Sequence, residues 1–295
     1  MSAQGSDMSA LFTCPSHLAS TPDHRIMWQH ALCEVGFETV NFSSVSLSND
    51  AALSAYAQCL QTATVVDFGW SCLRVVPVIE GKPQYDQIKV HPIGGYGLTQ
   101  LLLQQLGSRN IAVDPKNDIW TQSQFELNRR KTLTEILQNC CSFASSVIDE
   151  DFLYFLNGRP IDLKSEMTLI SNLHFNQLEG DSEEDTVMPL PQLISSSINE
   201  CSDTSKRKLW NNIVSSGGFS RLSSFIDKVQ EELKSVADPI FDVRVLYPMH
   251  NLTGYENQVW TGGSIFSSSS IFPHFLVTKE EWFENGDSIL NVKFK

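Results

Sequence analysis

The sequence is short of basic residues, of zinc-type cysteine spacings and of long apolar runs. Its 295 residues include 21 Lys and Arg against 34 Asp and Glu, so the formal net charge is −13. Contact with nucleic-acid phosphates requires clustered cations, and we therefore predict no direct nucleic-acid partner. The seven cysteines form no C-x-x-C pair, which predicts reduced thiols and no metal site. No run approaches the ~18 apolar residues of a membrane span, and residues 1–10 lack a signal-peptide core, so we expect a soluble intracellular protein without a membrane partner.

The sequence also lacks the common catalytic motifs. It contains neither a G-x-G-x-x-G dinucleotide fingerprint nor a G-x-S-x-G nucleophile elbow. Asp67-Phe68-Gly69 matches the metal-binding tripeptide of protein kinases, but no H-R-D loop and no V-A-I-K strand accompany it, which excludes a kinase. The acidic stretch 179–185 is interpreted as a solvated surface insert. We predict that the chain has no catalytic residues and is not an enzyme.

What the sequence does contain is a strongly apolar stretch at 65–81, VVDFGWSCLRVVPVIEG. It predicts two strands joined by a tight turn at Gly69 and Trp70. In a phosphate-binding hairpin of this plan, the N–H groups of the turn face the phosphates and an acidic residue such as Asp67 holds a metal-bound water. Gly95 and the pair Gly217-Gly218 also lie between a strand and a helix, where an anion can bind, although glycines there also permit plain turns.

Strand and helix patterns alternate along most of the chain. Helical periodicity predicts helices at 22–33, 49–58, 98–106, 123–144, 190–200 and from Gly217-Gly218 to about 236. Strands are predicted at 39–45, 88–93, 212–215 and 241–247, a hairpin turn at Asn157-Gly158, and a Gly-Gly turn with a last helix at 260–270. This alternation predicts the α/β class.

Five segments, in order, resemble the actin superfamily. The hairpin matches that family's second phosphate loop at Asp67, Gly69, Pro77, Glu80 and Gly81. The other four lie at 49–58, 93–106, 211–233 and 259–290. In that order they resemble the family's catalytic helix, its Gly-x-x-Leu-Thr turn, its adenosine-side Gly-Gly loop and its C-terminal Trp-x-Gly-Gly-Ser helix. The resemblance implies an actin-like, ribonuclease-H-like duplicated fold that is truncated at its N-terminus, without the first phosphate loop and the small subdomain beside it.

The same resemblance implies a domain organisation. We predict a disordered segment at 1–10, a remnant of the first actin-like domain at 11–62, a second, larger domain at 63–237, and a C-terminal segment at 238–295 that returns to the first domain.

Departures from the family pattern imply a degenerate nucleotide site. Asp50 replaces the family's water-orienting Gln, and Trp70 and Ser71 replace the second Asp and Gly of the loop. Three residues that hold the base are replaced by Leu137, Gln138 and Asn257. An indole binds no metal-water shell, and phosphoryl transfer depends on positioning and charge neutralisation. We therefore predict no ATPase activity and no required cofactor. Weak ATP or ADP retention through Asp67, Gly69, Gly95, Gly217 and Gly218 stays open.

Short matches favour one branch of the family. Cys14-Pro15-Ser16-His17 and the runs at 92–95 and 203–206 resemble the actin-related subunit at the pointed end of dynactin's short filament. This implies a non-catalytic capping subunit in the cytoplasm and cytoskeleton, with other actin-related proteins and dynactin-like subunits as partners. Tyr247-Pro248 and the ending at 277–289 fit equally well a nuclear actin-related subunit of a chromatin-remodelling complex, which is the alternative.

Overall fold

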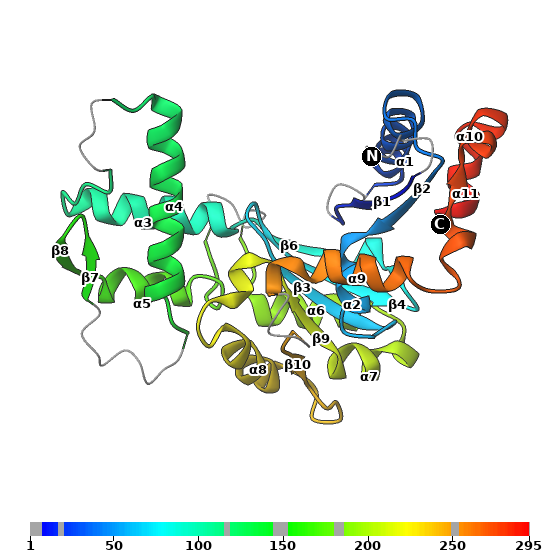
Figure 1. The fold of residues 1–295 in the computed structure, drawn as a ribbon. Coiled ribbons are helices and arrows are strands. Elements are labelled where there is room, and N and C mark those ends of the chain that lie inside the picture. The colour runs from blue at the N-terminus through cyan, green and yellow to red at the C-terminus, as the bar shows by residue number, and fades with distance from the viewer. Residues whose placement is uncertain are drawn as a thin grey trace.

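The computed structural model describes residues 8–16, 21–114, 119–143, 153–179, 186–248 and 254–294. Figure 1 shows three parts in a row: a central sheet with helices, a mainly helical arm on its left, and a small sheet with helices on its right. Within the described residues, no helix is long and apolar enough to cross a membrane. The alternation of strands and helices confirms the predicted α/β class.

The central sheet is built around the predicted hairpin. The two hairpin strands, β3 (Ala63–Phe68) and β4 (Leu73–Ile79), pair antiparallel, with Val65 opposite Val76. On the other side of β3, strand β9 (Ile213–Ser216) runs parallel to it. The six strands are β10 (Val245–Leu246), β9 (Ile213–Ser216), β3 (Ala63–Phe68), β4 (Leu73–Ile79) and β5 (Lys82–Pro83) in that order, with β6 (Lys89–His91) also paired to β4. The sequence therefore placed the hairpin correctly, because both of its strands are mainly apolar runs on either side of a tight turn.

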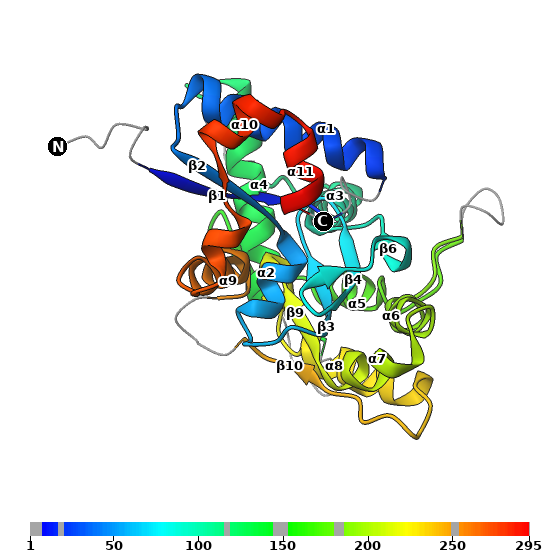
Figure 2. The same cartoon turned by 90° about the vertical axis from the view of Figure 1, so that its right-hand side faces the viewer.

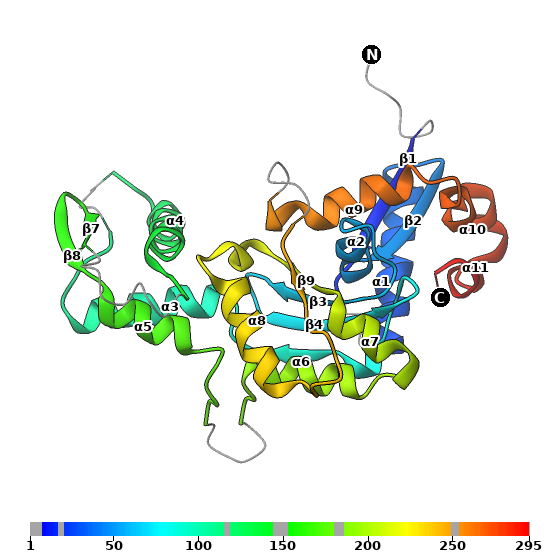
Figure 3. The same cartoon turned by 90° about the horizontal axis from the view of Figure 1, so that it is seen from below.

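Helices cover both faces of this sheet (Figure 3). Since successive strand residues point to opposite faces, Val65 and Val66 enter different cores. Val65 packs with the small residues of α2 (Asp50–Tyr56), which also contacts α9 (Gln258–Ser267), whereas Val66 joins the larger core on the opposite face. The helices of that opposite face are α6 (Leu190–Asn199), α7 (Asp203–Asn211) and α8 (Phe225–Val236).

The small sheet has its own core. Its order is β1-β2-β11, and β11, from the C-terminal part of the chain, pairs antiparallel with β2. Figure 2 shows helices α1, α10 and α11 gathered beside β1 and β2. Phe37 and Trp282 stack there with ring centroids 5.9 Å apart. The elements are β1 (Ser9–Cys14), α1 (Pro22–Glu34), a π-helical turn (Val35–Thr39), β2 (Ser44–Asn49), β11 (Val277–Thr278), α10 (Lys279–Asn285) and α11 (Ser288–Lys293).

The arm on the other side of the central sheet is mainly helical. The helix α4 begins with a reciprocal capping box between Thr121 and Gln124, which satisfies two N–H groups of its first turn. The predicted Asn157-Gly158 turn is confirmed. Its φ angles are 50° and 77°, and a two-residue type I′ hairpin turn requires positive φ at both positions. The arm comprises α3 (Gly95–Ser108), α4 (Gln122–Cys140), β7 (Leu153–Leu156), β8 (Arg159–Asp162) and α5 (Lys164–Asn172).

Several predicted elements differ from the observed ones. Residues 39–45 are mostly not a strand: the π-helical turn ends at Thr39 and the strand is β2. The strand predicted at 241–247 has only the two residues of β10, and α7 occupies the stretch before β9. Ser9 and Ala10, predicted as disordered, pair in β1, while residues 1–7 and most of the acidic stretch lie outside the described residues. Each error falls where partner strands or helices, rather than local periodicity, set the element.

The glycine pair at 262–263 was also predicted wrongly as a turn. Both residues lie inside α9, and they are buried. A side chain at Gly262 would collide with the backbone of α2, so glycine is needed where α9 passes this close to α2. Glycine here allows two helices to approach, a use that the local sequence does not distinguish from a turn.

Two buried histidines in the large core predict a pH-dependent stability. The His91 and His174 rings lie 4.5 Å apart between centroids, and both are fully buried. Burial is the main cause that lowers the pKa of each to about 4, and the neighbouring His91 contributes to the lowering at His174. The unfolded chain therefore binds protons more readily, so the stability that is present above pH 6.5 is lost as the pH falls from 6.5 toward 4.

We expect the free energy of unfolding to fall by roughly 1–2 kcal/mol for each histidine between pH 7 and pH 5. Urea unfolding at both pH values measures this change. In His174→Phe, which keeps an aromatic ring but does not titrate, the drop should be about half as large. An equal drop in wild type and variant would contradict the assignment.

Candidate functional site

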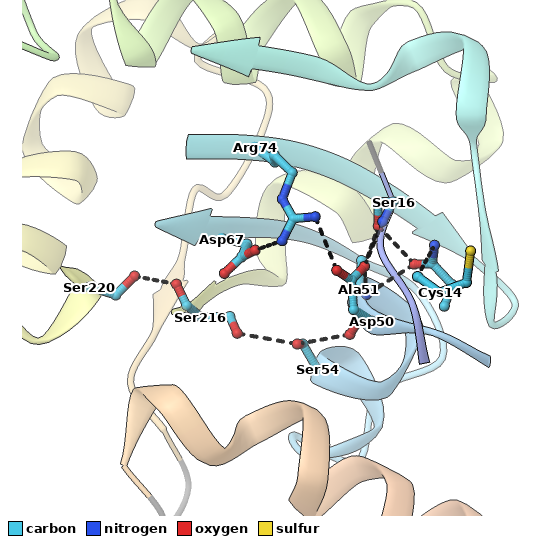
Figure 4. Close-up of polar contacts among 10 residues, drawn as sticks. Cys14, Ser16, Asp50, Ala51, Ser54, Asp67, Arg74, Ser216 and Ser220 are labelled. Atoms are coloured by element: carbon cyan, nitrogen blue, oxygen red, sulfur yellow. Dashed lines mark hydrogen bonds and ion pairs between the residues drawn. The ribbon is translucent and has the colours of Figure 1, made fainter. Parts of the chain in front are cut away.

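An ion-paired arginine occupies the place where the hairpin was predicted to hold a metal-bound water. Arg74 of β4 lies between two carboxylates: its Nη1 is 3.1 Å from Asp50 Oδ2, and its Nη2 pairs with Asp67 (Figure 4). The three side chains are only 11%, 16% and 19% exposed. Burial alone would lower the pKa of Arg74, but the charges of Asp67 and Asp50 raise it above its ordinary value. The guanidinium is therefore a permanent cation that pairs with both carboxylates and offsets one of their two negative charges.

Asp50 is held from the small-sheet side as well. Its Oδ1 accepts hydrogen bonds from the backbone N–H of Ser16, at 3.1 Å, from the Ser16 hydroxyl, and from the N–H of Ala51, at 2.8 Å. Asn49 caps α2 through the same N–H of Ala51 and accepts a second bond from Ser16. Every carboxylate oxygen named here has a partner, as buried polar groups require. Since the partners of Asp50 include Ser16, just after β1, and Arg74 of β4, the cluster connects the small sheet to the central hairpin.

A line of serines continues the polar contacts along the same face (Figure 4). The Ser54 hydroxyl lies 3.0 Å from the carbonyl of Asp50 and 3.2 Å from the hydroxyl of Ser216, and Ser220 donates to the carbonyl of Ser216 at 2.5 Å. Only about 10 Å³ of accessible space remains between Ser16, Asp50, Ser54, Asp67 and Arg74, which admits at most about one water. Within the described ranges, no group of three His, Cys, Asp or Glu residues can hold a metal.

The glycines predicted to face phosphate use their N–H groups inside the chain. Gly69 donates to the carbonyl of Cys72 at 3.1 Å, and Gly95 donates to the carbonyl of Gly69 at 3.0 Å. Tyr96 donates to the carbonyl of Trp70 at 2.7 Å. The start of α3 is thus bonded to the hairpin turn. A Cβ at Gly95 would lie 2.0 Å from the Phe219 ring, so glycine here permits packing and does not present an anion site.

Gly217 also serves a close approach. Its φ is 90°, and its N–H donates to the carbonyl of Tyr255 at 3.2 Å. A Cβ there would lie 2.4 Å from the Phe68 carbonyl oxygen and 2.6 Å from Asp67 Oδ1, so only glycine fits without strain. Gly218 begins the short 3-10 turn Gly218–Arg221, and a Cβ on it would meet open space. The structure therefore brings Asp67, Gly69, Gly95 and Gly217 together, but their polar groups are bonded to other groups of the same chain.

The residues that depart from the family pattern have distinct places. Leu137 is buried in the large core, and Gln138 faces outward on the next position of α4. Asn257 ends a 3-10 turn at the start of α9. Trp70 and Ser71 form the exposed turn of the hairpin, where the Trp70 ring lies 5.9 Å from that of Tyr96 and 6.1 Å from that of Phe219.

Sequence reasoning missed Arg74 and Ser16 as members of the site. Arg74 is the one charged residue within the apolar strand β4, and that local conflict was a usable signal. Its pairing with Asp67 follows from the hairpin, where the two residues lie opposite each other, but Asp50 and the Ser16 that bonds it come from elements far from Arg74 in the sequence.

Residues 15–295 match the family described as "Actin". The chain belongs to the actin family. This match spans nearly the whole chain and confirms the actin-like fold that the five segments implied.

Three relatives of this actin-family chain share about a quarter of its residues at matched positions. It is 26% identical to the actin-29 sequence of Dictyostelium discoideum over 89% of the chain and 67% of that protein. It is 24% identical to actin-related protein 4 of Arabidopsis thaliana, over 95% and 71%, and 26% identical to actin-related protein 3 of Saccharomyces cerevisiae, over 88% and 62%. The chain thus spans about two thirds of the lengths of these relatives, and it is a divergent actin-related protein.

Proposed function

We propose that this actin-related protein works without catalysis, as a structural subunit of a complex that contains other actin-related proteins. The observation that carries the proposal is the pairing of Arg74 with both Asp50 and Asp67. A nucleotide hydrolase of this fold needs acidic groups that are free to hold a metal ion and its water, and donors that face the phosphates. Here an internal cation takes the acidic groups and backbone carbonyls take the donors.

We expect the purified chain to hydrolyse no Mg-ATP above the rate of a buffer blank and to bind Mg-ATP at most weakly. The physical reason is that a phosphate would have to displace Arg74 from two ion pairs inside a space of about 10 Å³. Isothermal titration and a phosphate-release assay measure both quantities. Trp70→Asp alone should restore neither, because the Arg74 pairs remain. Sub-micromolar Mg-ATP affinity of the wild type would refute the proposal of a non-nucleotide subunit.

Within this proposal, the complex is dynactin-like and the chain caps a short actin-related filament. Support comes from the short matches around Cys14-Pro15-Ser16 and at 92–95 and 203–206. The surface of α9 supports a subunit contact: Trp260 is 75% exposed and Ile265 is 44% exposed on this helix, and large exposed apolar side chains mark interaction sites when they gather. The second candidate is a nuclear chromatin-remodelling complex, favoured by Tyr247-Pro248.

Tagging the chain in cells and identifying the proteins that co-purify with it tests which complex is correct. We expect dynactin subunits, and we expect depletion to impair dynein-driven transport while histone exchange is unchanged. Trp260→Glu should reduce the recovery of companions at least tenfold. Phe283→Glu, on α10 and 60% exposed, is the matched control and should leave recovery unchanged. Remodeller subunits with altered histone exchange would establish the nuclear alternative instead.

A further inference from the structure

Trp70 separates two cavities that the proposed function does not use. The larger, about 410 Å³, lies between α3 and α4, and the smaller, about 310 Å³, lies along α4. Trp70 and Arg130 line both cavities, so these two side chains form a shared wall. Each volume is near the lower end of the range for ligand pockets. A ligand that uses both must pass over this wall.

The wall is aromatic and solvent-accessible. Trp70 is 36% exposed, and its neighbour Tyr96 is 54% exposed. On the side of the larger cavity, Leu103, Leu127 and Leu133 add an apolar lining. Large rings that remain exposed beside an apolar cavity provide contact area at small conformational cost, as anchor sites at protein interfaces do.

The wall is also cationic. The Arg130 guanidinium lies 5.7 Å from the centroid of the Trp70 ring, a distance that allows a cation–π contact. Among the described residues, Arg130 and Lys131 have no carboxylate within ion-pair distance, whereas the neighbouring Arg129 pairs with Asp114. Glu126 and Glu135 each line one cavity but lie beyond ion-pair distance of Arg130 and Lys131, so these two cations are available to a carboxylate of a ligand.

We propose that this groove, defined by Trp70, Tyr96, Arg130 and Lys131, binds an extended acidic peptide segment of a partner subunit. An acidic side chain of the peptide pairs with Arg130 at the wall. A large apolar or aromatic side chain enters the larger cavity beside Trp70 and Tyr96. An extended chain suits the groove because it presents successive side chains to successive pockets. The proposal rests on the proposed role as a complex subunit, and it assigns to Trp70 a binding role.

Selection of random dodecapeptides displayed on phage against the full chain tests this proposal. Enriched peptides should carry Asp or Glu next to an aromatic or long aliphatic residue. Labelled synthetic copies, measured by fluorescence anisotropy, should bind Arg130→Glu at least tenfold more weakly than wild type. Trp70→Ala should weaken binding similarly. Arg207→Glu, at another exposed arginine on α7, is the matched control and should bind within twofold of wild type.

The peptide proposal is overturned if the enriched peptides lack acidic residues, or if Arg130→Glu binds them as well as wild type does. Displacement of the peptide by micromolar ATP would also overturn it, because the groove would then be a nucleotide site. Because Arg130 is exposed, its replacement leaves the fold intact, which circular dichroism verifies. The assay uses the isolated chain, so a negative result here leaves the co-purification test of the subunit role standing.

Discussion

Replacing Arg74 by methionine is expected to lower the free energy of unfolding by ~3–5 kcal/mol. Methionine has a similar length and no charge, so the variant retains bulk while it removes the cation from between Asp50 and Asp67. Both carboxylates are more than four-fifths buried. Without a counterion they repel each other in a poorly solvated place. Urea unfolding at pH 7 measures the loss.

A triple variant separates charge from packing at this cluster. Combining Arg74→Met with Asp50→Asn and Asp67→Asn leaves neutral groups that keep most of the hydrogen bonds to Ser16 and Ala51. We expect this variant to recover most of the lost stability, because the penalty of Arg74→Met is that of unpaired buried charge. A single variant that unfolds like wild type would mean that the ion pairs do not stabilise the join between the small sheet and the hairpin.

A second large effect is expected from Gly262→Ala in α9. The added Cβ would lie 1.7 Å from the carbonyl oxygen of Leu53 and 3.1 Å from the nitrogen of Ala57. These are backbone atoms of α2 and its C-terminal end, so they cannot move aside as a side chain does. The two helices must separate, and we expect a loss of about 3 kcal/mol, at the upper end of overpacking effects. Thermal unfolding should show it as a lower midpoint.

The adjacent glycine provides the control. A Cβ at Gly263 would lie 3.4 Å from Leu11 Cδ2 and 3.8 Å from Leu53 Cδ1, which the side chains can accommodate. Alanine also has a higher helix propensity than glycine, because glycine loses more conformational entropy when the chain folds. We therefore expect Gly263→Ala to be neutral or slightly stabilising. If both substitutions lower stability equally, the close approach of α2 and α9 is not the cause.

The sequence by itself determined the features that depend on neighbouring residues. The runs of β3 and β4, the Asn157-Gly158 turn and the periodic helices α1, α4 and α6 were predicted close to their observed bounds, whereas α8 begins at Phe225, several residues after the predicted start. Apolar periodicity and turn chemistry act over a few residues, so they can be read without knowing the fold. The order of the motifs also implied the actin-like fold, which the family match confirms.

The candidate site was predicted only in part. The resemblance grouped Asp67, Gly69, Gly95 and Gly217 as one degenerate nucleotide site, and it identified Asp50 and Trp70 as departures. It did not reveal that the N–H groups of these glycines are bonded to carbonyls of the same chain. A phosphate loop and a self-bonded loop have the same glycines, and the difference lies in which acceptor each N–H group reaches.

The tertiary structure alone decided the partners of isolated polar and small residues. Arg74 meets Asp50, His91 meets His174, and Gly262 meets Leu53. The two residues are 24 positions apart in the first pair (74 − 50), 83 in the second (174 − 91) and 209 in the third (262 − 53). Local propensity has no term for such pairs. They form because packing α2 and α9 onto the central sheet, and the segment after α5 against β6, brings these groups out of water together, where each must be paired or fitted.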